Sequence, residues 1–511
     1  MNMNASIASA GRAYTPEQSR AVIAGSTLPA GAHLRVRAGA GTGKTTTLVG
    51  VARARENQRG LYLAFNADIA REARLKFDQT NCRAVTFHAL CLAAASPEMY
   101  GEAARRYQVK GDVLQHPAFA RIGFPRLMGW STYKLALAML RTVSIFCASD
   151  EPSVTTLHAR EALIAETGDP ETLKGEFPRE RALRAISAFA RPLAVAAREF
   201  FEAKIAEGHF SHEVYLKLVA LRPDLCARAF GGAEYLIVDE AQDLNPVQIQ
   251  LLRQSGRSIV AVGDAAQAIY AWRGAISALE KLPGDTAHLS NSFRFGPDIA
   301  ALANKVLRAS PEGDLGVQVT GVGGSVPENY AGARYAVLCR TNAAILDEAS
   351  GLATAGHSYH IDRSDQLRAE IQSALAIFRG DLREVTVPEF RAFSTWAELA
   401  EEASGNRNVE QIVKIIEEDR AGEALAVLNA SQPAEQARVT LMAGHRSKGL
   451  EFPVVKMAAD WVGLRDLAER VKEARDSSPK HLIAATQEYN LLYVAFTRAM
   501  QRLVGAERLL N

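Results

Sequence analysis

The sequence predicts an α/β protein with two parallel-sheet cores, each interrupted by a helical insertion. Short apolar runs such as LYLAF and YLIVDEA alternate with longer amphipathic stretches, which is the pattern of βαβ units. Residues 92–228 and 378–434 lack this alternation and have a helical periodicity throughout. A glycine-rich turn near residue 40 lies directly between an apolar run and a helical stretch. We therefore expect two parallel sheets, the first of which carries a phosphate-binding loop.

The changes of pattern along the chain give the boundaries of these parts. The predicted parts, in chain order, are a flexible tail (1–12), a first core (13–91 and 229–290) with a helical insertion (92–228), and a second core (291–377 and 435–511) with a reduced helical insertion (378–434). The tail is predicted because its residues are small and polar.

Composition and charge exclude several classes of protein. The 511 residues carry 59 Lys and Arg against 57 Asp and Glu, so the net charge is too small to attract polyanions over the whole surface. Any nucleic acid must therefore bind in local grooves. No apolar run approaches the roughly 18 residues of a spanning helix, and the N-terminus lacks a signal-peptide pattern. We expect a cytoplasmic protein without membrane contact.

The cysteines make a disulfide framework or a metal cluster improbable. Five cysteines are an odd number, and they are widely spaced with no C-x-x-C pair. This pattern predicts reduced, buried thiols, with no disulfides, zinc site or iron–sulfur cluster.

The string AGAGTGKTT, from Ala38 to Thr46, is the strongest local signal. Glycines allow backbone N–H groups to point at a phosphate, and the following helix N-terminus favours an anion. Lys44 would reach the β- and γ-phosphates, and Thr45 would bind Mg²⁺. Ala38 stands where many such loops have glycine, and a turn without a ligand is the alternative. The predicted nucleotide-binding residues are Gly39, Ala40, Gly41, Thr42, Gly43, Lys44, Thr45 and Thr46.

The string YLIVDEAQD supplies the acidic half of a nucleotide-hydrolysis site. Asp239 at the strand end would hold Mg²⁺, and Glu240 would polarise the attacking water. Acidic residues also end strands by chance, so this string alone leaves both interpretations open. The glycine-rich loop upstream favours ATP hydrolysis with Mg²⁺.

Ten sequence blocks occur in an order typical of one protein family. They are TPEQ from Thr15, the glycine-rich loop, AFNADIAREA from Ala64, TFHAL from Thr86, DEAQD from Asp239, GDAAQAIYAWRGA from Gly263, SFRFGPDIA from Ser292, CRTNA from Cys339, HRSKGLEF from His445 and YVAFTRA from Tyr493. The chain resembles the UvrD/Rep family of superfamily 1 DNA helicases, nearest to the short F-box DNA helicase type without the F-box. The resemblance covers residues 15–499 and implies two RecA-like cores.

The resemblance also implies roles in nucleotide binding. Gln18 would bind the adenine edge, and Phe293 would stack on its face, although a packing role for Phe293 is the alternative. Glu451, behind the turn at Gly449, would bind the ribose.

Further residues are implied to act in hydrolysis. Gln267 would couple the γ-phosphate to the DNA site. Arg294 and Arg498 would reach the nucleotide from the second core and stabilise transition-state charge. Without the surrounding blocks, each arginine would be read as a solvated surface residue.

The DNA site is implied by aromatic and polar residues at strand ends. The spacing of Tyr270, Trp272 and Arg273 suits stacking on successive bases, although a core tryptophan is the alternative. The second core would contribute His445, where Ala443 replaces the usual threonine two residues earlier. The other predicted DNA-contacting residues are Phe65, Asn66, Thr86, Phe87 and His88.

The start of the first insertion has a local excess of positive charge. Seven Lys and Arg residues face three acidic residues between positions 101 and 150. Binding of DNA phosphates and a solvated helix face are both compatible with this composition.

The resemblance implies an ATP-dependent translocase or helicase on single-stranded DNA, with 3′→5′ polarity, in repair, recombination control or defence against mobile elements. Single-stranded DNA and ss/ds junctions are the expected partners, together with a protein loading partner or nuclease subunit. The alternative is an ATP-gated DNA clamp, or the motor subunit of a complex whose nuclease lies elsewhere. A small-molecule kinase or GTPase would share only the glycine-rich loop.

Overall fold

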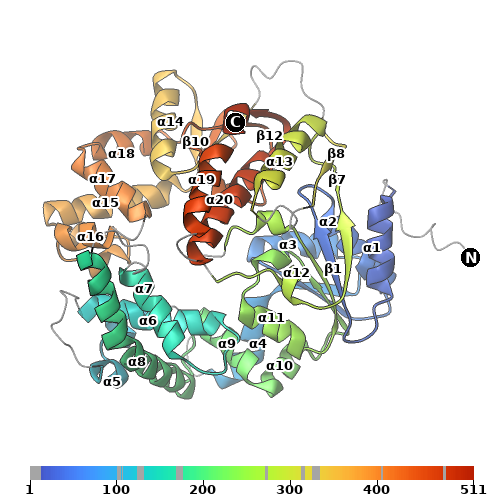
Figure 1. The fold of residues 1–511 in the computed structure, drawn as a ribbon, viewed down its shortest axis with the longest axis horizontal. Helices are drawn as coiled ribbons and strands as arrows, with labels where there is room; N and C mark the ends of the chain where they lie inside the picture. Colours follow the sequence, from blue (N-terminus) through green and yellow to red (C-terminus); the bar gives the residue numbers. More distant parts are fainter. Residues whose placement is uncertain are drawn as a thin grey trace, which may run out of the picture. The chain divides into compact units, whose positions relative to one another are not determined.

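The computed structural model describes residues 13–99, 105, 107–122, 132–167, 176–270, 274–311, 317–324, 334–403, 407–475 and 479–510. The chain divides into two compact units. The first comprises Met1–Asn291 and Asp314–Gln318, and the second comprises Ser292–Gly313 and Val319–Asn511. Figure 1 labels their helices and strands. The predicted tail at 1–12 lies outside the described residues.

The first unit is built on a parallel sheet with the strand order β3-β2-β4-β5-β1-β6. Its strands are β1 (His33–Ala38), β2 (Gly60–Ala64), β3 (Cys82–Thr86), β4 (Tyr235–Val238), β5 (Ser258–Gly263) and β6 (Asp285–Leu289). Every residue of β2, β4 and β5 is buried, as expected for central strands of a sheet covered on both faces. This explains why these strands are continuous apolar runs in the sequence.

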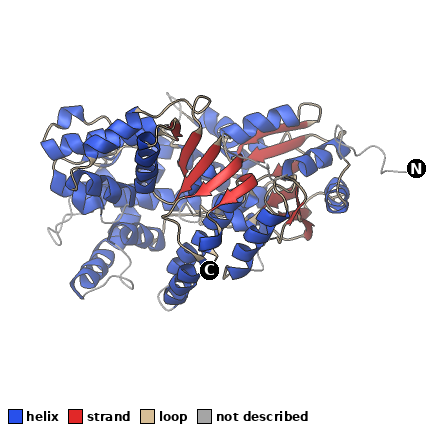
Figure 2. Ribbon diagram, turned by 90° about the horizontal axis from the view of Figure 1, so that it is seen from above, coloured by secondary structure: helices blue, strands red, loops and turns tan. Residues whose placement is uncertain are grey.

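Alternate residues of the strands β2, β3, β4 and β5 enter two different hydrophobic clusters. In β4, Tyr235 and Ile237 pack with α1, α2 and α3, whereas Leu236 and Val238 pack with α4, α11 and α12. The helices are α1 (Pro16–Ser26), α2 (Lys44–Ala54), α3 (Ala67–Lys76), α4 (Phe87–Ala95), α11 (Pro246–Gln254) and α12 (Ala278–Lys281). The first core is therefore a sheet between two helical layers. Figure 2 colours the strands of the molecule red and its helices blue.

The segment between α4 and β4 contains helices and no strand in its described residues. Its elements are η2 (Ser96–Glu98), the π-helix η3 (Val109–Val113), α5 (Pro117–Ala120), α6 (Thr132–Ala148), α7 (Thr156–Thr167), α8 (Glu176–Ala206), α9 (His212–Leu221) and α10 (Pro223–Phe230). The predicted limits of the insertion, residues 92 and 228, lie inside α4 and α10, respectively.

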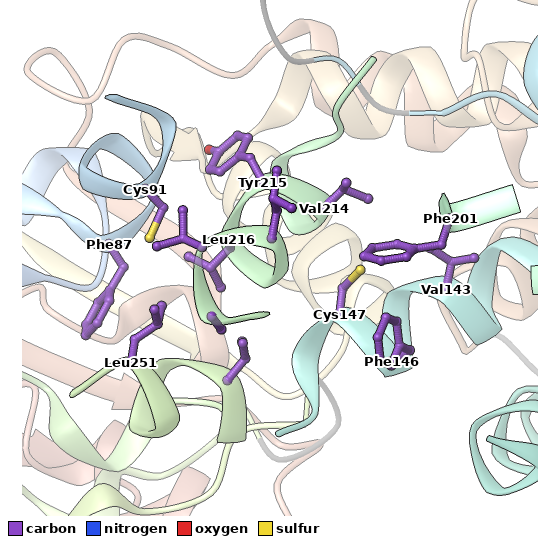
Figure 3. Close-up of a cluster of buried hydrophobic side chains, with 14 of the residues drawn as sticks. Phe87, Cys91, Val143, Phe146, Cys147, Phe201, Val214, Tyr215, Leu216 and Leu251 are labelled. Atoms are coloured by element: carbon purple, nitrogen blue, oxygen red, sulfur yellow. The ribbon is translucent and has the colours of Figure 1, made fainter. Parts of the chain in front are cut away.

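The insertion shares one hydrophobic cluster with the sheet. Figure 3 shows Phe87 and Cys91 of α4 and Leu251 of α11 in one group with α9 residues such as Leu216. The same group continues to Phe146 of α6 and other side chains of the insertion. The insertion is therefore packed as an extension of the first core.

The second unit has its own parallel sheet, with the order β10-β11-β9-β12-β13. Its strands are β9 (Tyr335–Cys339), β10 (Tyr359–Ile361), β11 (Val439–Ala443), β12 (Phe452–Met457) and β13 (Ala499–Val504). A short pair, β7 (Asn291–Ser292) and β8 (Thr320–Gly321), lies outside this sheet. Two parallel sheets with helices confirm the predicted fold class.

Helices of the second unit surround its sheet and form the second insertion. They are α13 (Pro297–Ala309), α14 (Asn342–Thr354), α15 (Ser364–Arg379), α16 (Trp396–Ala403), α17 (Arg407–Glu417), α18 (Ala421–Asn429), α19 (Leu464–Arg475) and α20 (Pro479–Phe496). Helices α17 and α18 pack against α14 and α15. The predicted start of the insertion, residue 378, lies inside α15.

Two further observations concern the membrane and the cysteines. Within the described residues, no helix combines the length and the apolar character that crossing a bilayer requires. Each of the five cysteines is a buried free thiol.

Candidate functional site

The predicted site residues of the first unit follow strands that end at one edge of the sheet. In a parallel sheet all carboxyl ends lie at the same edge, which is where such folds bind ligands. Neighbouring strands β4, β5 and β1 lead into Asp239, Asp264 and the glycine-rich loop, respectively. Strand β2, next to β4, leads into Phe65, and β3, on the far side of β2, leads into the Thr86 turn. The topology thus explains how segments far apart in sequence come to share one edge.

The glycine-rich loop has the geometry of an anion-binding turn. Gly41 and Gly43 have φ values of 72° and 76°, in the left-handed region that favours glycine. Helix α2 begins directly afterwards at Lys44, and no side chain caps its first turn. The N–H groups of that turn can therefore bind an anion, which the helix dipole favours. Thr45 is half-buried and Thr46 is exposed in the same turn.

Further contacts hold the loop in place. The Gly39 N–H donates to the Leu289 carbonyl of β6 at 3.0 Å, and the Thr42 hydroxyl donates to the Gly39 carbonyl at 2.9 Å. Ala38 is the last residue of β1 and packs in the same cluster as Leu289. The alanine methyl is therefore part of the core, which explains why glycine is not needed there. Ala40 is also buried.

Two buried carboxylates follow β4 and β5. Oδ2 of Asp239 accepts a hydrogen bond from the Tyr62 hydroxyl at 2.5 Å, and Oδ1 accepts the Glu240 N–H at 2.9 Å. Burial and the neighbouring Glu240 carboxylate raise the pKa of Asp239, while the Tyr62 hydrogen bond and Lys44 oppose that rise. Burial also raises the pKa of Asp264, again opposed by Lys44. Lys44 therefore lies where its charge acts on both acids.

Glu240 is held in an unusual backbone conformation. Its φ of 51° lies in the left-handed region, which is uncommon for a residue with a side chain and is frequent at functional sites. The Gln242 side-chain amide donates to the Glu240 carboxylate. The predicted general base is therefore oriented by both its backbone and a neighbouring side chain.

A hydrogen-bonded chain connects Glu240 to Gln267. Oε1 of Gln242 accepts the Asp264 N–H at 3.1 Å, and Oδ2 of Asp264 accepts from the Gln267 amide at 2.6 Å. A Cβ at Gly263 would lie 2.3 Å from Oε1 of Gln242, so the close approach requires glycine. Sequence reasoning did not assign roles to Tyr62, Gln242 or Asp264. Gln242 lies within the DEAQD block and Asp264 within the GDAAQ block, so these blocks could have indicated both residues.

The residues present are compatible with Mg²⁺ bound together with a nucleotide. Magnesium commonly uses one or two protein oxygens and completes its shell with phosphate and water. Thr45 and Asp239 offer one hydroxyl and one buried carboxylate for this purpose. Across the described part of the chain, no cluster of three or more His, Cys, Asp or Glu side chains forms an all-protein metal cage.

Gln18 belongs to a capping box at the start of α1. Its Oε1 accepts the Thr15 N–H at 3.0 Å, and its amide donates to the Thr42 carbonyl in the glycine-rich loop at 3.4 Å. Glu17 in the same turn accepts the N–H and hydroxyl of Ser290 after β6. These contacts place Gln18 beside the loop, and its predicted bond to adenine stays a prediction.

Arg294 and Glu451, both predicted to contact the nucleotide, bind each other in the second unit. The Arg294 guanidinium contacts Oε1 of Glu451 at 2.5 and 2.9 Å and donates to the Thr497 carbonyl at 2.9 Å. Gly449 has a φ of 87°, which supports the predicted turn before Glu451. Phe293 is half-buried.

Arg498 is packed inside the second unit. Its side chain is 1% exposed and donates to the Val494 carbonyl at 2.9 Å, the Thr497 hydroxyl at 3.1 Å and the Leu450 carbonyl at 3.3 Å. The alternative of a solvated surface arginine is therefore wrong. Its predicted contact with ATP stays a prediction.

The predicted DNA-contacting residues of the first unit differ in the contacts that they make. Phe65 and Tyr270 stack on each other, with ring centroids 5.6 Å apart and an interplanar angle of 12°. Asn66 and Thr86 cap α3 and α4 by accepting backbone N–H groups. The ring of His88 contacts Tyr215 edge-on.

The prediction for Phe87 is corrected by its burial. Its side chain is 1% exposed and packs between α4 and α11 in the hydrophobic cluster of Figure 3. Because its ring contributes to the core, it is not available for stacking on a base. Trp272 and Arg273 lie outside the described residues.

The basic start of the first insertion is partly neutralised. Arg105 pairs with Asp112 at 2.8 Å and Arg121 pairs with Glu199. Arg141 pairs with Glu166 at 2.5 Å. These pairs favour the solvated-face interpretation for the three arginines. Arg106 and Arg126 lie outside the described residues.

His445 follows β11 at the carboxyl edge of the second sheet. Burial and the nearby Arg340 guanidinium lower its pKa to about 4, while Glu488 opposes this shift. The imidazole is therefore neutral near pH 7 and can donate or accept one hydrogen bond.

Comparisons with known proteins agree with this arrangement. Residues 18–273 match the AAA domain family, and residues 379–505 match the UvrD-like helicase C-terminal domain family. F-box DNA helicase 1 of Gallus gallus is 27% identical over 97% of the chain and 49% of its own length. F-box DNA helicase protein 1 of Schizosaccharomyces pombe is 26% identical over 92% of the chain and 55% of its own length.

A shorter match involves the ATP-dependent DNA helicase PcrA of Leuconostoc citreum, with 34% identity over 24% of the chain and 20% of that protein. The chain spans about half the length of the two F-box helicases that it matches. The AAA domain match alone covers half of the chain, and the second match covers much of the C-terminal part. The chain therefore belongs to the UvrD-like helicase family, with an AAA domain followed by a UvrD-like helicase C-terminal domain.

Proposed function

We propose that the chain is an ATP-driven motor that moves along single-stranded DNA and acts as a DNA helicase. The observation that carries this proposal is the hydrogen-bonded chain from Glu240 through Gln242 and Asp264 to Gln267. It starts at the predicted general base and ends at Gln267, four residues after β5 and three residues before Tyr270. Hydrolysis and DNA contact would therefore be linked through these hydrogen bonds and the short segment from Gln267 to Tyr270.

In this proposal Lys44 and the first turn of α2 bind the phosphates of ATP. Glu240 orients the attacking water and accepts its proton, while Gln242 keeps the carboxylate in place. Mg²⁺ held by Thr45 and Asp239 would neutralise charge that develops on the phosphates. Arg294 and Arg498 of the second unit would stabilise the transition state.

Tyr270 and Phe65 supply the stacking surface of the proposed DNA site. Base stacking is tolerant of sequence, so we propose binding of single strands and ss/ds junctions without base preference. The finer parts of the proposal are 3′→5′ polarity, a cytoplasmic location, a protein partner for loading or nuclease activity, and a role in repair, recombination control or defence against mobile elements. The polarity, the partner and the pathway are supported by the family alone.

The test is ATP turnover with and without single-stranded DNA. We expect strong stimulation by DNA, and loss of turnover in Lys44→Ala and Glu240→Gln. Glu56→Gln, an exposed glutamate after α2, is the matched control and should behave like the parent protein. Equal turnover with and without DNA would contradict a motor and favour an ATP-gated clamp or a motor subunit that requires a missing partner. Strand displacement on 3′- and 5′-tailed duplexes measures the polarity.

A further inference from the structure

A polar cluster at the carboxyl edge of the second sheet has no role in the function proposed so far. Arg340 follows β9, His445 follows β11 and Asp460 follows β12. Glu488 enters the cluster from the middle of α20. Only His445 was predicted to contact DNA. The other three residues need an explanation, because buried charges are costly unless they are paired.

Arg340 and Glu488 form a bidentate ion pair. Nε of Arg340 donates to Oε2 of Glu488 at 2.9 Å, and a terminal nitrogen donates to Oε1. Their side chains are 17% and 21% exposed. A parallel two-bond contact of this kind fixes orientation as well as distance. Glu488 therefore determines where the Arg340 guanidinium points.

Asp460 fixes the backbone at the same place. Its carboxylate accepts the N–H groups of Arg340 at 3.0 Å and Thr341 at 2.8 Å, and the Thr341 hydroxyl at 2.9 Å. Thr341 in turn caps α14. Arg340 is thus held at its backbone by Asp460, three residues after β12, and at its side chain by Glu488 of α20.

The turn that carries His445 rests on the same helix. This turn, η9 (Gly444–Ser447), packs against α20. A Cβ at Gly444 would lie 2.5 Å from the Trp461 ring and 3.5 Å from Leu491 of α20. Nε1 of Trp461 donates to the Leu338 carbonyl at 2.7 Å, so the ring cannot easily retreat. The position of η9 therefore depends on the position of α20.

The other end of α20 holds the arginines that are predicted to act on ATP. The Thr497 carbonyl, directly after α20, accepts from Arg294. The Arg498 guanidinium donates to Val494 in the last turn of α20 and to the Leu450 carbonyl, next to Glu451. Glu488 and Thr497 are nine positions apart, which corresponds to about 14 Å of helix rise. All of these residues belong to the second unit.

We infer that Glu488 is a positioning residue that couples the His445 turn to Arg294 and Arg498 through α20. DNA that shifts η9 or Arg340 would move Glu488, and the helix would carry that displacement to Thr497 and Arg498. The inference rests on the proposed function, because it assumes that His445 faces DNA and that the two arginines face ATP. It is based on the continuous contacts from η9 and Arg340 through α20 to Thr497 and Arg498, and measuring how DNA changes ATP turnover tests it directly.

The experiment compares Glu488→Gln with the parent protein in steady-state ATP turnover against the concentration of an oligothymidylate. We expect basal turnover and the KM for ATP to stay within about twofold, and the DNA-stimulated rate to fall about tenfold, within the usual range of coupling between sites. The double exchange Arg340→Glu with Glu488→Arg should recover part of the stimulation. Glu469→Gln, exposed on the neighbouring helix α19, is the matched control and should leave stimulation unchanged.

A second variant keeps the test decisive if Glu488→Gln does not fold. Gly444→Ala pushes η9 away from Trp461 without changing charge, and we expect the same loss of stimulation with basal turnover retained. Parental stimulation in both variants would overturn the inference, and so would a loss of basal turnover as large as the loss of stimulated turnover. Absence of stimulation in the parent protein would instead contradict the proposed motor function.

Discussion

Beside Gln242, Gly263 has room for a hydrogen atom and nothing larger. A methyl group there would meet the Gln242 side-chain oxygen at 2.3 Å and Leu279 at 3.1 Å. Gln242 would have to leave its bonds to Glu240 and the Asp264 N–H. The absence of a side chain at Gly263 is therefore required for the hydrogen-bonded connection between Glu240 and Gln267.

We predict that Gly263→Ala lowers ATP turnover at least about tenfold and destabilises the first unit by about 1–3 kcal/mol, the usual cost of overpacking. Turnover and urea unfolding measure the two effects. Gly232→Ala is the matched control, because a Cβ there meets nothing within 4 Å. Parental turnover in Gly263→Ala would show that Gln242 does not orient Glu240.

Arg294 and Arg498 should respond differently to replacement by alanine. Arg294 is 12% exposed, and without it the more exposed Glu451 carboxylate can still be hydrated by water, so we expect a small change in melting temperature. We expect a large loss of turnover, because Arg294 is proposed to stabilise the transition state. Loss of the buried Arg498 leaves the Val494 and Leu450 carbonyls without this donor, which should cost about 2–4 kcal/mol of stability. Turnover at saturating ATP and thermal melting separate the two effects. An unchanged melting temperature in Arg498→Ala would contradict this assignment.

His445 should make the second unit less stable in acid. Its pKa of about 4 in the folded protein lies below the ordinary value of 6.5. Between these values the unfolded chain binds a proton that the folded chain does not, so stability falls as the pH drops through this window. Allowing for its half-buried ring, we expect a loss of about 1–2 kcal/mol between pH 7 and pH 4.5. Urea unfolding across this range should show a shallower decline for His445→Gln, and an equally steep decline would point to other groups.

Among the elements, strands were more predictable from sequence than helix ends. The central strands β2, β4 and β5 are buried on both faces, so their apolar runs stand out in the sequence. The changes of periodicity at residues 92, 228 and 378 do not mark helix ends, because α4, α10 and α15 continue across them. Helices α4 and α10 pack on neighbours from both sides of the predicted boundary, whereas α15 packs on α16, α17 and α18 of the insertion. Such packing is not visible in local periodicity.

In the candidate site, local sequence motifs were predictable, whereas contacts between distant residues were not. Residues within contiguous blocks, such as Lys44 and Glu240, were identified because strand, turn and chemistry coincide locally. The Arg340–Glu488 pair joins positions 148 residues apart. Local sequence patterns do not indicate which acidic residue an arginine contacts over such a separation. Phe87 was misassigned because a helix-starting aromatic can face either the core or the solvent, and only the packing of α11 decides this.

Helix α9 joins the insertion to the first core, so a substitution in α9 should affect both parts. Leu216 is buried in the cluster that contains side chains of α4, α6 and α11 (Figure 3). We predict that Leu216→Ala destabilises the first unit by about 2–5 kcal/mol, and that helix content and nucleotide binding are lost in one transition. Leu157→Ala, on the exposed side of α7, is the control and should change stability by less than about 0.5 kcal/mol. Two separate transitions would contradict a shared core.

For the whole molecule, the small second insertion bears on how the proposed motor works. The segment 378–434 is rich in glutamate in its sequence, which makes it a poor surface for DNA phosphates. Its helices α17 and α18 pack on α14 and α15, and Arg420 pairs with Asp347 of α14 at 2.7 Å. It is therefore attached to the second core rather than free to grip a duplex.

We predict that the isolated monomer translocates on single strands and removes bound proteins better than it unwinds long duplexes. Stopped-flow translocation and strand displacement should be compared at concentrations where light scattering shows a monomer. Addition of a partner or self-association should increase the length of duplex that is separated. Unaided separation of hundreds of base pairs by the monomer would contradict this prediction.

Both insertions leave the sheets at their outer strands. The first follows β3 and α4, and β3 lies at the end of the first sheet farther from the glycine-rich loop. The second follows β10, at the end of its sheet opposite β13, the strand that begins directly after Arg498. A segment added or removed at an outer strand breaks no pairing between inner strands. Insertions of different sizes at these two places are therefore compatible with the same inner strands, including β4, β5 and β1, which lead into Asp239, Asp264 and the glycine-rich loop.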